Sequence, residues 1–118
     1  MRVIIAGGRD FTDKPRMINF IDSLVDNNQL PSRFEIVSGM AKGADCVGLA
    51  LAKEYGLLVH EFPADWIKHG KPAGMIRNVD MANNADALIV AWDGKSRGTA
   101  HMIQTMQRMG KPVFILRY

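Results

Sequence analysis

The chain has 118 residues, a length that fits one domain, so we expect residues 1–118 to form a single unit. Its composition, with 47% hydrophobic and 23% charged residues, is that of a globular protein and argues against a disordered one. The formal net charge of +3 slightly favours anionic partners but is too small to indicate nucleic acid by itself. The single cysteine, Cys46, excludes an internal disulfide and fits a reducing compartment. Because no apolar run approaches the roughly 18 residues of a membrane span, we expect a cytoplasmic protein without a membrane partner.

Apolar runs alternate with amphipathic stripes along the chain. In order, they predict a strand at 2–6, a helix at 13–27, a strand at 34–38, a helix from Ala44 to Gly56, a strand at 57–62, a helix at 75–83, a strand at 86–92, a helix at 99–109 and a strand at 111–117. Residues 63–74 hold two prolines and two glycines and are expected to form a loop. Five strands that alternate with helices predict an α/β fold with a doubly wound, mostly parallel sheet and helices on both faces.

The unusual polar residues gather at one end of the predicted strands. Four segments that follow strands hold most of the glycines and many of the charged residues, namely GGRDF, SGMAKGAD, PADWIKHGKPAGMIRN and DGKSRGT. The loops at the opposite end, such as NNQL, have no comparable cluster of glycines and charged residues. Open α/β sheets bind ligands beyond the carboxyl ends of their strands, so this asymmetry predicts a site along one edge of the sheet.

These residue types suit a phosphate and a nucleoside. Glycines let backbone amides approach an anion, and Gly43 and Gly98 are expected to open helices whose N–H groups meet a phosphate. Basic side chains neutralise phosphate, carboxylates and amides bind ribose hydroxyls or base edges, and Trp66 can stack on a base. The sequence therefore predicts a nucleotide-like ligand held by Gly7, Gly8, Arg9, Asp10, Ser38, Gly39, Lys42, Gly43, Asp45, Trp66, Arg77, Asn78, Asp93, Gly94, Ser96, Arg97, Gly98 and Thr99.

Each of these residues also has a structural interpretation. The glycines can be turn formers, Asp45 can cap its helix, Arg77 can form a surface ion pair, and Trp66 can pack over the sheet edge. Arg77 is expected to be exposed at the start of its helix. Cys46 is expected to be a small buried residue, because no histidine stands at a spacing that would make it a nucleophile.

Several common sites are missing from the sequence. The histidines are scattered and no CxxC or HxxxH pattern occurs, so we expect no metal. The chain has no GxxxxGK[ST] segment, which excludes a P-loop NTPase, and GGRDFT lacks the spacing of a dinucleotide fingerprint. We therefore expect no cofactor.

Taken in order, the four segments GGRDF, SGMAKGAD, PADWIKHGKPAGMIRN and DGKSRGT resemble the YspA/YpsA-related branch of the SLOG superfamily, which is named after the Smf/DprA and lonely guy (LOG) proteins. The resemblance spans nearly the whole chain. It implies a Rossmann-like fold and a pocket for a nucleotide or a nucleotide-derived molecule. Members of the superfamily include phosphoribohydrolases, single-stranded DNA binders and sensors of nucleotide signals.

At one position the chain differs from the LOG hydrolases that it resembles. Their helix-borne arginine matches Arg77, and the Gly-Thr of their GGxGTxxE segment matches Gly98 and Thr99, but their glutamate matches Met102. Methionine cannot stabilise an oxocarbenium-like centre, so the resemblance implies binding and puts hydrolysis in doubt. The carboxylates that can substitute are Asp45, Asp93 and Glu61. Met102, Ile103, Met106 and Met109 share one side of their helix and are expected in the core.

Three functions therefore remain open. The first is a non-catalytic nucleotide-binding protein that senses or sequesters its ligand, and the second is a phosphoribohydrolase-like N-glycosidic hydrolase. The third is a single-stranded nucleic-acid binder, which needs a basic track with stacking aromatics, and few of the aromatics lie near the predicted site. The apolar helix faces are compatible with a homo-oligomer and equally with core packing.

Overall fold

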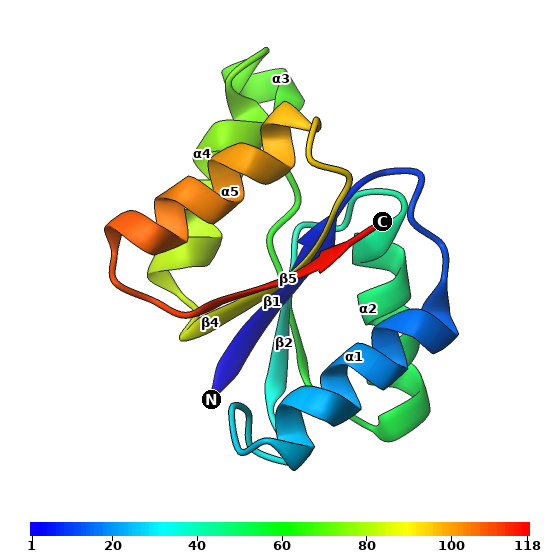
Figure 1. Ribbon diagram of the computed structural model, residues 1–118. Coiled ribbons are helices and arrows are strands. Elements are labelled where there is room, and N and C mark those ends of the chain that lie inside the picture. Colours follow the sequence, from blue (N-terminus) through cyan, green and yellow to red (C-terminus); the bar gives the residue numbers. More distant parts are fainter.

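The computed structural model describes all of residues 1–118 and contains one five-stranded sheet with helices on both faces (Figure 1). The elements in chain order are β1 (Arg2–Gly7), α1 (Lys14–Asp26), β2 (Glu35–Ser38), α2 (Ala44–Tyr55), β3 (Val59–Glu61), α3 (Trp66–His69), α4 (Ala73–Asn83), β4 (Ala87–Trp92), α5 (Arg97–Arg108) and β5 (Val113–Arg117). All strand pairs are parallel, in the order β3-β2-β1-β4-β5. The Rossmann-like, doubly wound α/β fold expected from the sequence is confirmed.

The strand β1 lies at the centre of the sheet because its residues are apolar on both faces. Val3, Ile4 and Ile5 have no exposed surface, which is typical of a parallel strand covered by helices on both sides. β1 pairs with β2 on one side and with β4 on the other. From β1 the chain adds β2 and β3 on one side of the sheet and then β4 and β5 on the other. The gap between β1 and β4 is therefore the topological switch point of the sheet, and sheets of this kind bind ligands in the crevice above it.

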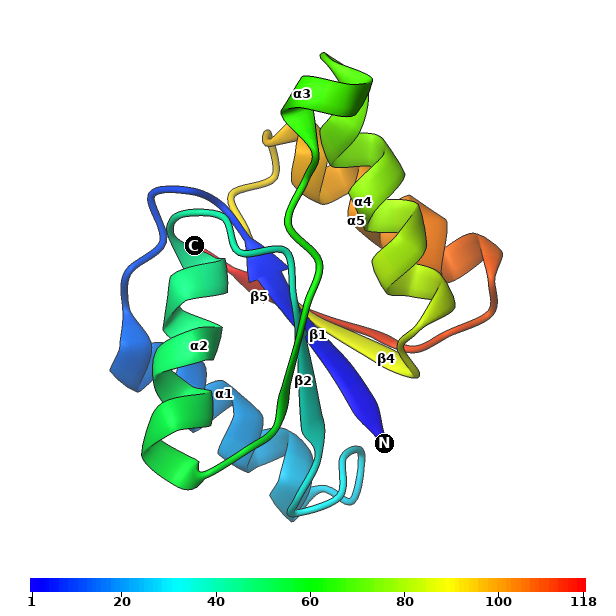
Figure 2. The same cartoon turned by 180° about the vertical axis from the view of Figure 1, so that it is seen from behind.

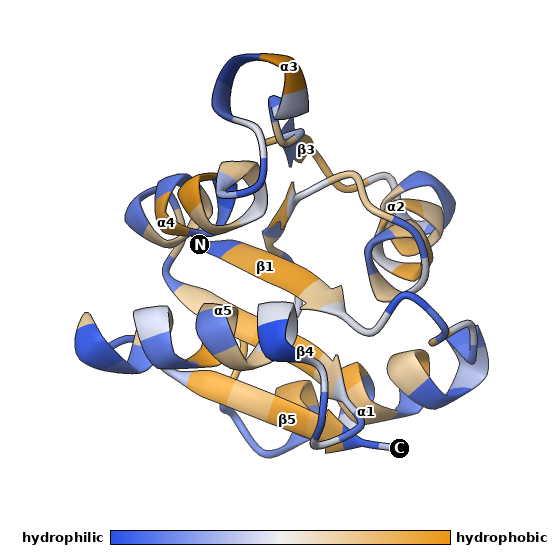
Figure 3. Ribbon diagram, turned by 90° about the horizontal axis from the view of Figure 1, so that it is seen from above, coloured by the Kyte–Doolittle hydropathy of each residue, from blue (hydrophilic) through white to orange (hydrophobic).

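Alternate residues of β1 point into two separate cores. Ile5 packs with residues of α1 and α2 on one face of the sheet, and Ile4 packs with residues of α4 and α5 on the other. Figures 1 and 2 show the two helix pairs on opposite sides of the strands, and Figure 3 shows apolar strands between helices with hydrophilic outer surfaces. No helix combines the length and the apolar character that crossing a membrane requires.

The segment 63–74 differs from the expected loop. The short helix α3 forms there because the carboxylate of Asp65 accepts a hydrogen bond of 3.0 Å from the backbone N–H of Lys68. Gly70, with a φ of +65°, ends α3, and α4 then begins at Ala73 rather than at Met75. Gly70 and Pro72 of this segment thus mark the end of α3 and the start of α4.

Two expectations about burial are wrong. Cys46 is exposed, although it lies in the first turn of α2. Met109 is 38% exposed because α5 ends one residue before it, at Arg108. Met102 and Met106 are buried, as the apolar stripe predicts.

Gly48 determines how closely α2 approaches the sheet, since a Cβ atom at this position would lie 2.9 Å from the Cβ of Ile5. We predict that Gly48→Ala lowers the free energy of unfolding by about 1–3 kcal/mol, because a methyl group added to a packed interior forces its neighbours apart. Gly98 in α5 has open space around it. Gly98→Ala is therefore the matched control and should be neutral or stabilising by up to about 1 kcal/mol, since alanine is the better helix former. Urea unfolding measures both values, and a Gly48→Ala variant as stable as the parent would contradict the close packing.

Candidate functional site

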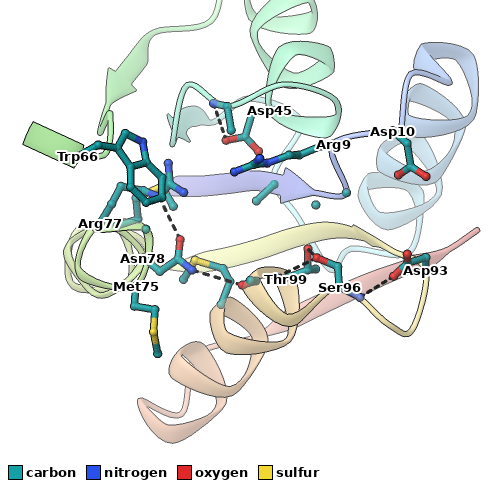
Figure 4. A pocket seen from close by; sticks show the side chains of 18 of the residues that line it. Arg9, Asp10, Asp45, Trp66, Met75, Arg77, Asn78, Asp93, Ser96 and Thr99 are labelled. Carbon is teal, nitrogen blue, oxygen red and sulfur yellow. Dashed lines mark hydrogen bonds between the residues drawn. The ribbon is translucent and has the colours of Figure 1, made fainter. Parts of the chain in front are cut away.

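A pocket of about 500 Å³ opens above the switch point, at the carboxyl ends of β1 and β4 (Figure 4). The segment after β1, the segment after β2, the region of α3 and α4, and the start of α5 all contribute to it. Its lining consists of Ala6, Gly7, Gly8, Arg9, Asp10, Ala41, Asp45, Trp66, Lys71, Gly74, Met75, Arg77, Asn78, Met81, Asp93, Ser96, Gly98, Thr99 and Met102.

The pocket has an apolar base and a polar wall. Ala6, Met81 and Met102 belong to the core between the sheet and helices α4 and α5, and they also line the pocket. Trp66 and Met75 lie nearer the solvent, where 52% and 54% of their surfaces are exposed. Exposed apolar side chains beside a core-lined pocket offer contact to a flat, apolar part of a ligand.

The two loops after β1 and β2 are in backbone contact at Gly43. This residue has a φ of +76°, and a Cβ atom on it would lie 2.2 Å from the carbonyl oxygen of Gly8. The same oxygen accepts a hydrogen bond of 3.1 Å from the backbone N–H of Ala44, the first residue of α2. Gly43 therefore permits packing between loops, and the first amide of α2 is used by the protein itself.

Arg77 connects the loop after β2 to helix α4. Its Nη1 donates a hydrogen bond of 2.7 Å to the carbonyl oxygen of Gly39, and its Nε donates one of 3.1 Å to Oδ1 of Asn78. The amide nitrogen of Asn78 lies 3.4 Å from the carbonyl oxygen of Gly98 and 3.2 Å from Nδ1 of His101. A continuous chain of hydrogen bonds thus runs from the loop after β2, through α4, to the start of α5.

This arrangement corrects the expectation for Arg77. Its side chain is half-buried rather than exposed, and it lies in the second turn of α4 rather than at the start of the helix. No carboxylate lies within ion-pair distance of it, so the surface ion pair is also absent. Burial lowers the pKa of Arg77, the charge of Asp45 raises it, and the charge of Arg9 lowers it further.

Asp45 is the buried carboxylate of the site, with 4% of its surface exposed. It does not cap α2, because Gly43 holds that position and α2 has no side-chain cap. Its Oδ2 instead accepts a hydrogen bond of 3.2 Å from the backbone N–H of Ala41. Burial raises the pKa of Asp45, against the opposing effects of the Ala41 N–H and the Arg77 charge.

Asp93 organises the loop after β4. Its Oδ1 accepts hydrogen bonds of 2.8 Å from the backbone N–H groups of both Lys95 and Ser96, and these bonds hold the pKa of Asp93 below its ordinary value. Ser96 then caps α5. The N–H groups of Arg97 and Gly98 have no acceptor within the protein, and Gly98 lines the pocket. The start of α5 is therefore a helix terminus that offers free donors beside the pocket.

Asp10 is held at one end of the pocket by a residue from the other end of the chain. The hydroxyl of Tyr118 donates a hydrogen bond of 2.5 Å to Oδ1 of Asp10, and the Tyr118 ring lies 5.0 Å from that of Phe11. Burial and this bond raise the pKa of Tyr118 to about 12. Sequence reasoning missed Tyr118, since nothing in the order of residues links positions 10 and 118.

The structure brings twelve of the eighteen predicted binding residues to the pocket lining. These are Gly7, Gly8, Arg9, Asp10, Asp45, Trp66, Arg77, Asn78, Asp93, Ser96, Gly98 and Thr99. The other six, Ser38, Gly39, Lys42, Gly43, Gly94 and Arg97, lie outside it.

Local packing explains most of these six positions. Ser38 is buried, and its hydroxyl accepts a hydrogen bond of 3.2 Å from the N–H of Met40. Gly39 presents its carbonyl oxygen to Arg77, and Gly94 lies against the guanidinium of Arg117. Lys42 and Arg97, two of the four basic residues of the predicted set, are exposed beside the pocket loops.

The pocket also has residues that were absent from the predicted set. These are Ala6, Ala41, Lys71, Gly74, Met75, Met81 and Met102. Met102 was assigned to the core alone, whereas it is both a core residue and part of the pocket base. Lys71 follows α3, in the segment whose glycines and prolines already indicated an irregular backbone near the site. No group of three or more histidine, cysteine, aspartate or glutamate side chains is placed to hold a metal ion.

The opposite environments of Asp45 and Asp93 generate a prediction about pH. Asp45 should titrate above its ordinary pKa of 3.8 and Asp93 below it, and Arg77→Met should raise the pKa of Asp45 further while leaving Asp93 unchanged. Carbon-detected NMR of the carboxyl groups measures these values, with Asp93 as the internal control. Because the folded state binds the Asp45 proton more tightly than the unfolded state, this group should cost stability as the pH rises through its folded pKa. An Asp45 carboxyl that titrates below 3.8 would contradict its desolvation.

Comparison with known proteins identifies relatives of the chain. Residues 1–69 match the family described as the YspA, cpYpsA-related SLOG family. The chain is also 33% identical to the gene 61 protein of Mycobacterium phage D29 over 119 residues, which cover 95% of this chain and 93% of that protein. No solved structure matches the chain. The chain thus belongs to the YspA- and cpYpsA-related SLOG family, the group that its four loop segments resemble.

Proposed function

We propose that this protein binds a nucleotide or a nucleotide-derived molecule in the pocket above β1 and β4, as a sensor or a sequestering protein. The observation that carries the proposal is the combination, in one pocket at the switch point, of unpaired donors and an exposed aromatic ring. Membership of the SLOG family supports the same class of ligand.

The donors suit the phosphate of such a ligand. Arg9 is exposed, lines the pocket and forms neither a salt bridge nor a hydrogen bond within the protein. The free N–H of Gly98 adds a donor at the positive end of the α5 dipole. A phosphate that bridges these groups would gain charge-assisted hydrogen bonds at little cost, because neither donor has to give up a partner.

The opposite end of the pocket suits a base. Trp66 reaches the start of α4, where its ring would lie 3.5 Å from a Cβ atom built on Gly74. Met75 is exposed on the same helix, and Figure 4 shows both side chains on the side of the pocket away from Asp10 and Asp93. Stacking on an exposed aromatic ring accommodates any base, so Trp66 supports this class of ligand without selecting one.

The charges of the lining nearly balance. Its basic side chains are those of Arg9, Lys71 and Arg77, and its carboxylates are those of Asp10, Asp45 and Asp93. A polyanion would meet repulsion from the carboxylates, whereas the hydroxyl groups of a ribose can donate hydrogen bonds to them. The balance favours a ligand with few negative charges and several hydroxyl groups, such as a nucleoside monophosphate.

One observation favours the hydrolase as a second candidate. Asp45 is a buried carboxylate with a raised pKa inside the pocket, which is the environment of a general acid. Against it, Met102 lines the pocket at the position that resembles the hydrolase glutamate, and Glu61 lies outside the lining. Release of free base from adenosine monophosphate at about 1 per second or faster would show that the protein is a hydrolase rather than a non-catalytic binding protein.

The proposal predicts that Trp66→Leu weakens binding of adenosine monophosphate by about 1–3 kcal/mol, because base stacking on the ring is lost. Binding of ribose 5-phosphate should stay unchanged, since that molecule has no base. Tyr55→Leu is a matched control, because Tyr55 is 53% exposed and Trp66 is 52% exposed, and Tyr55 lies outside this pocket. Calorimetry measures all three proteins with both ligands. Equal affinity of the parent and Trp66→Leu for adenosine monophosphate would remove the base from this end of the pocket.

A further inference from the structure

His101 lies behind the pocket wall rather than in it. It belongs to α5, is partly buried, and contacts Asn78 through its Nδ1, which is 3.2 Å from the Asn78 amide nitrogen. Its own position is fixed by the helix, where its carbonyl oxygen accepts a hydrogen bond of 2.7 Å from the hydroxyl of Thr105. His101 is therefore placed to act on the site through Asn78.

The orientation of the Asn78 amide follows from its contact with Arg77. An arginine side chain has donors and no acceptor, so the Asn78 atom that lies 3.1 Å from Nε of Arg77 must be the oxygen. The amide nitrogen then faces the carbonyl oxygen of Gly98 and Nδ1 of His101. Because that nitrogen is also only a donor, Nδ1 of His101 has to be an acceptor and cannot have a proton.

We propose that His101 is a positioning residue for the ligand site, whose unprotonated Nδ1 fixes Asn78 and thereby the guanidinium group of Arg77, so that protonation of His101 weakens ligand binding. The effect on binding rests on the proposed function, whereas the effect on Arg77 does not. Protonation of Nδ1 would place two donors 3.2 Å apart. Rotation of the Asn78 amide would relieve that contact only by turning its nitrogen toward Nε of Arg77, which is again a donor.

Displacement of Arg77 would change the pocket in two places, at the Arg77 side chain itself and at the loop after β2. The bond from Nη1 of Arg77 to the carbonyl oxygen of Gly39 holds the loop after β2, and a Cβ atom built on Gly39 would lie within 3.0 Å of both Arg77 and Asp45. Arg77 and Asn78 both line the pocket. A charge change at His101 is thus transmitted to a basic group and to a loop that face the ligand.

The surroundings of His101 already favour the neutral form. Burial lowers the pKa of His101, and the positive charge of Arg108 lowers it further. Helix α4 carries Arg77 and Asp80, β4 has no charged residue, and β5 carries Arg117, but Arg108 is the charged group that acts on His101. Below the ordinary pKa of 6.5 the unfolded state binds more protons at this position than the folded state, so His101 should cost stability as the pH falls.

The first experiment follows Arg77 in the protein without ligand. The Nε–H signal of Arg77 in ¹⁵N-arginine-labelled protein should shift as His101 titrates, and a long-range ¹H–¹⁵N spectrum should show an unprotonated Nδ1 at neutral pH. In His101→Asn the Oδ1 atom replaces Nδ1 as an acceptor and does not titrate, so this Arg77 shift should disappear. An Arg77 signal that ignores the His101 titration, or a protonated Nδ1 at neutral pH, would overturn the inference whatever the protein binds.

The second experiment measures binding of adenosine monophosphate by calorimetry between about pH 7.5 and about pH 4.5. The parent protein should lose about three- to tenfold in affinity relative to His101→Asn as His101 becomes protonated, which corresponds to the loss of one hydrogen bond. The titration of the nucleotide phosphate and that of Asp45 are common to both proteins and cancel in this ratio. His101→Leu, which offers no acceptor, should bind more weakly than His101→Asn at neutral pH.

His69→Asn is the matched control, because His69 is a histidine near the pocket that takes no part in this chain of hydrogen bonds. It should keep the pH dependence of the parent. Parallel pH profiles for the parent and His101→Asn would overturn the role of His101 in binding. If no variant binds adenosine monophosphate at any pH, the proposed function fails for this ligand, and the NMR experiment alone decides whether His101 positions Arg77.

Discussion

The guanidinium group of Arg77 has donors on all three nitrogens and no acceptor, and the pocket wall depends on which acceptors those donors find. One donor meets the carbonyl oxygen of Gly39 and another meets the side chain of Asn78. Each end of this chain of hydrogen bonds belongs to a different loop or helix at the carboxyl edge of the sheet. Since β2 and α5 lie on opposite sides of the switch point, Arg77 and Asn78 tie together segments that the sheet alone would leave independent.

The charged residues of the site fall into two groups, those that hold its loops in place and those that are free to contact a ligand. Arg77 and Asp45 are buried or half-buried and hold loops in place, whereas Arg9 is exposed and free to meet a ligand. One carboxylate oxygen of Asp93 similarly accepts hydrogen bonds within the turn that leads into α5. The groups free for a ligand are therefore fewer than the polar residues of the lining, which favours recognition by a small number of well-placed contacts over a highly charged surface.

The position of the pocket could be predicted from the sequence, because glycines and charged residues after apolar strands have to meet at one edge of a parallel sheet. The base of the pocket could not, since Met81 and Met102 lie on helix stripes that look the same whether they pack on a strand or also face a cavity. The sequence also did not predict the hydrogen bond between Asp10 and Tyr118 or the contact between Asn78 and His101. Both join residues that only the strand order and the packing of α4 on α5 bring together.

The central claim is that a nucleotide binds above β1 and β4 and not elsewhere. The direct measurement is an NMR titration of the ¹⁵N-labelled protein with adenosine monophosphate, followed by assignment of the amide signals that move. Saturable shifts should concentrate at Gly8–Asp10, in the first turns of α4 and at Arg97–Thr99 around the free donors of α5. The absence of saturable shifts would contradict the claim. So would shifts confined to the second cavity, which lies between α1 and α2 and is lined by Ile18, Phe34, Tyr55 and Leu57 among others.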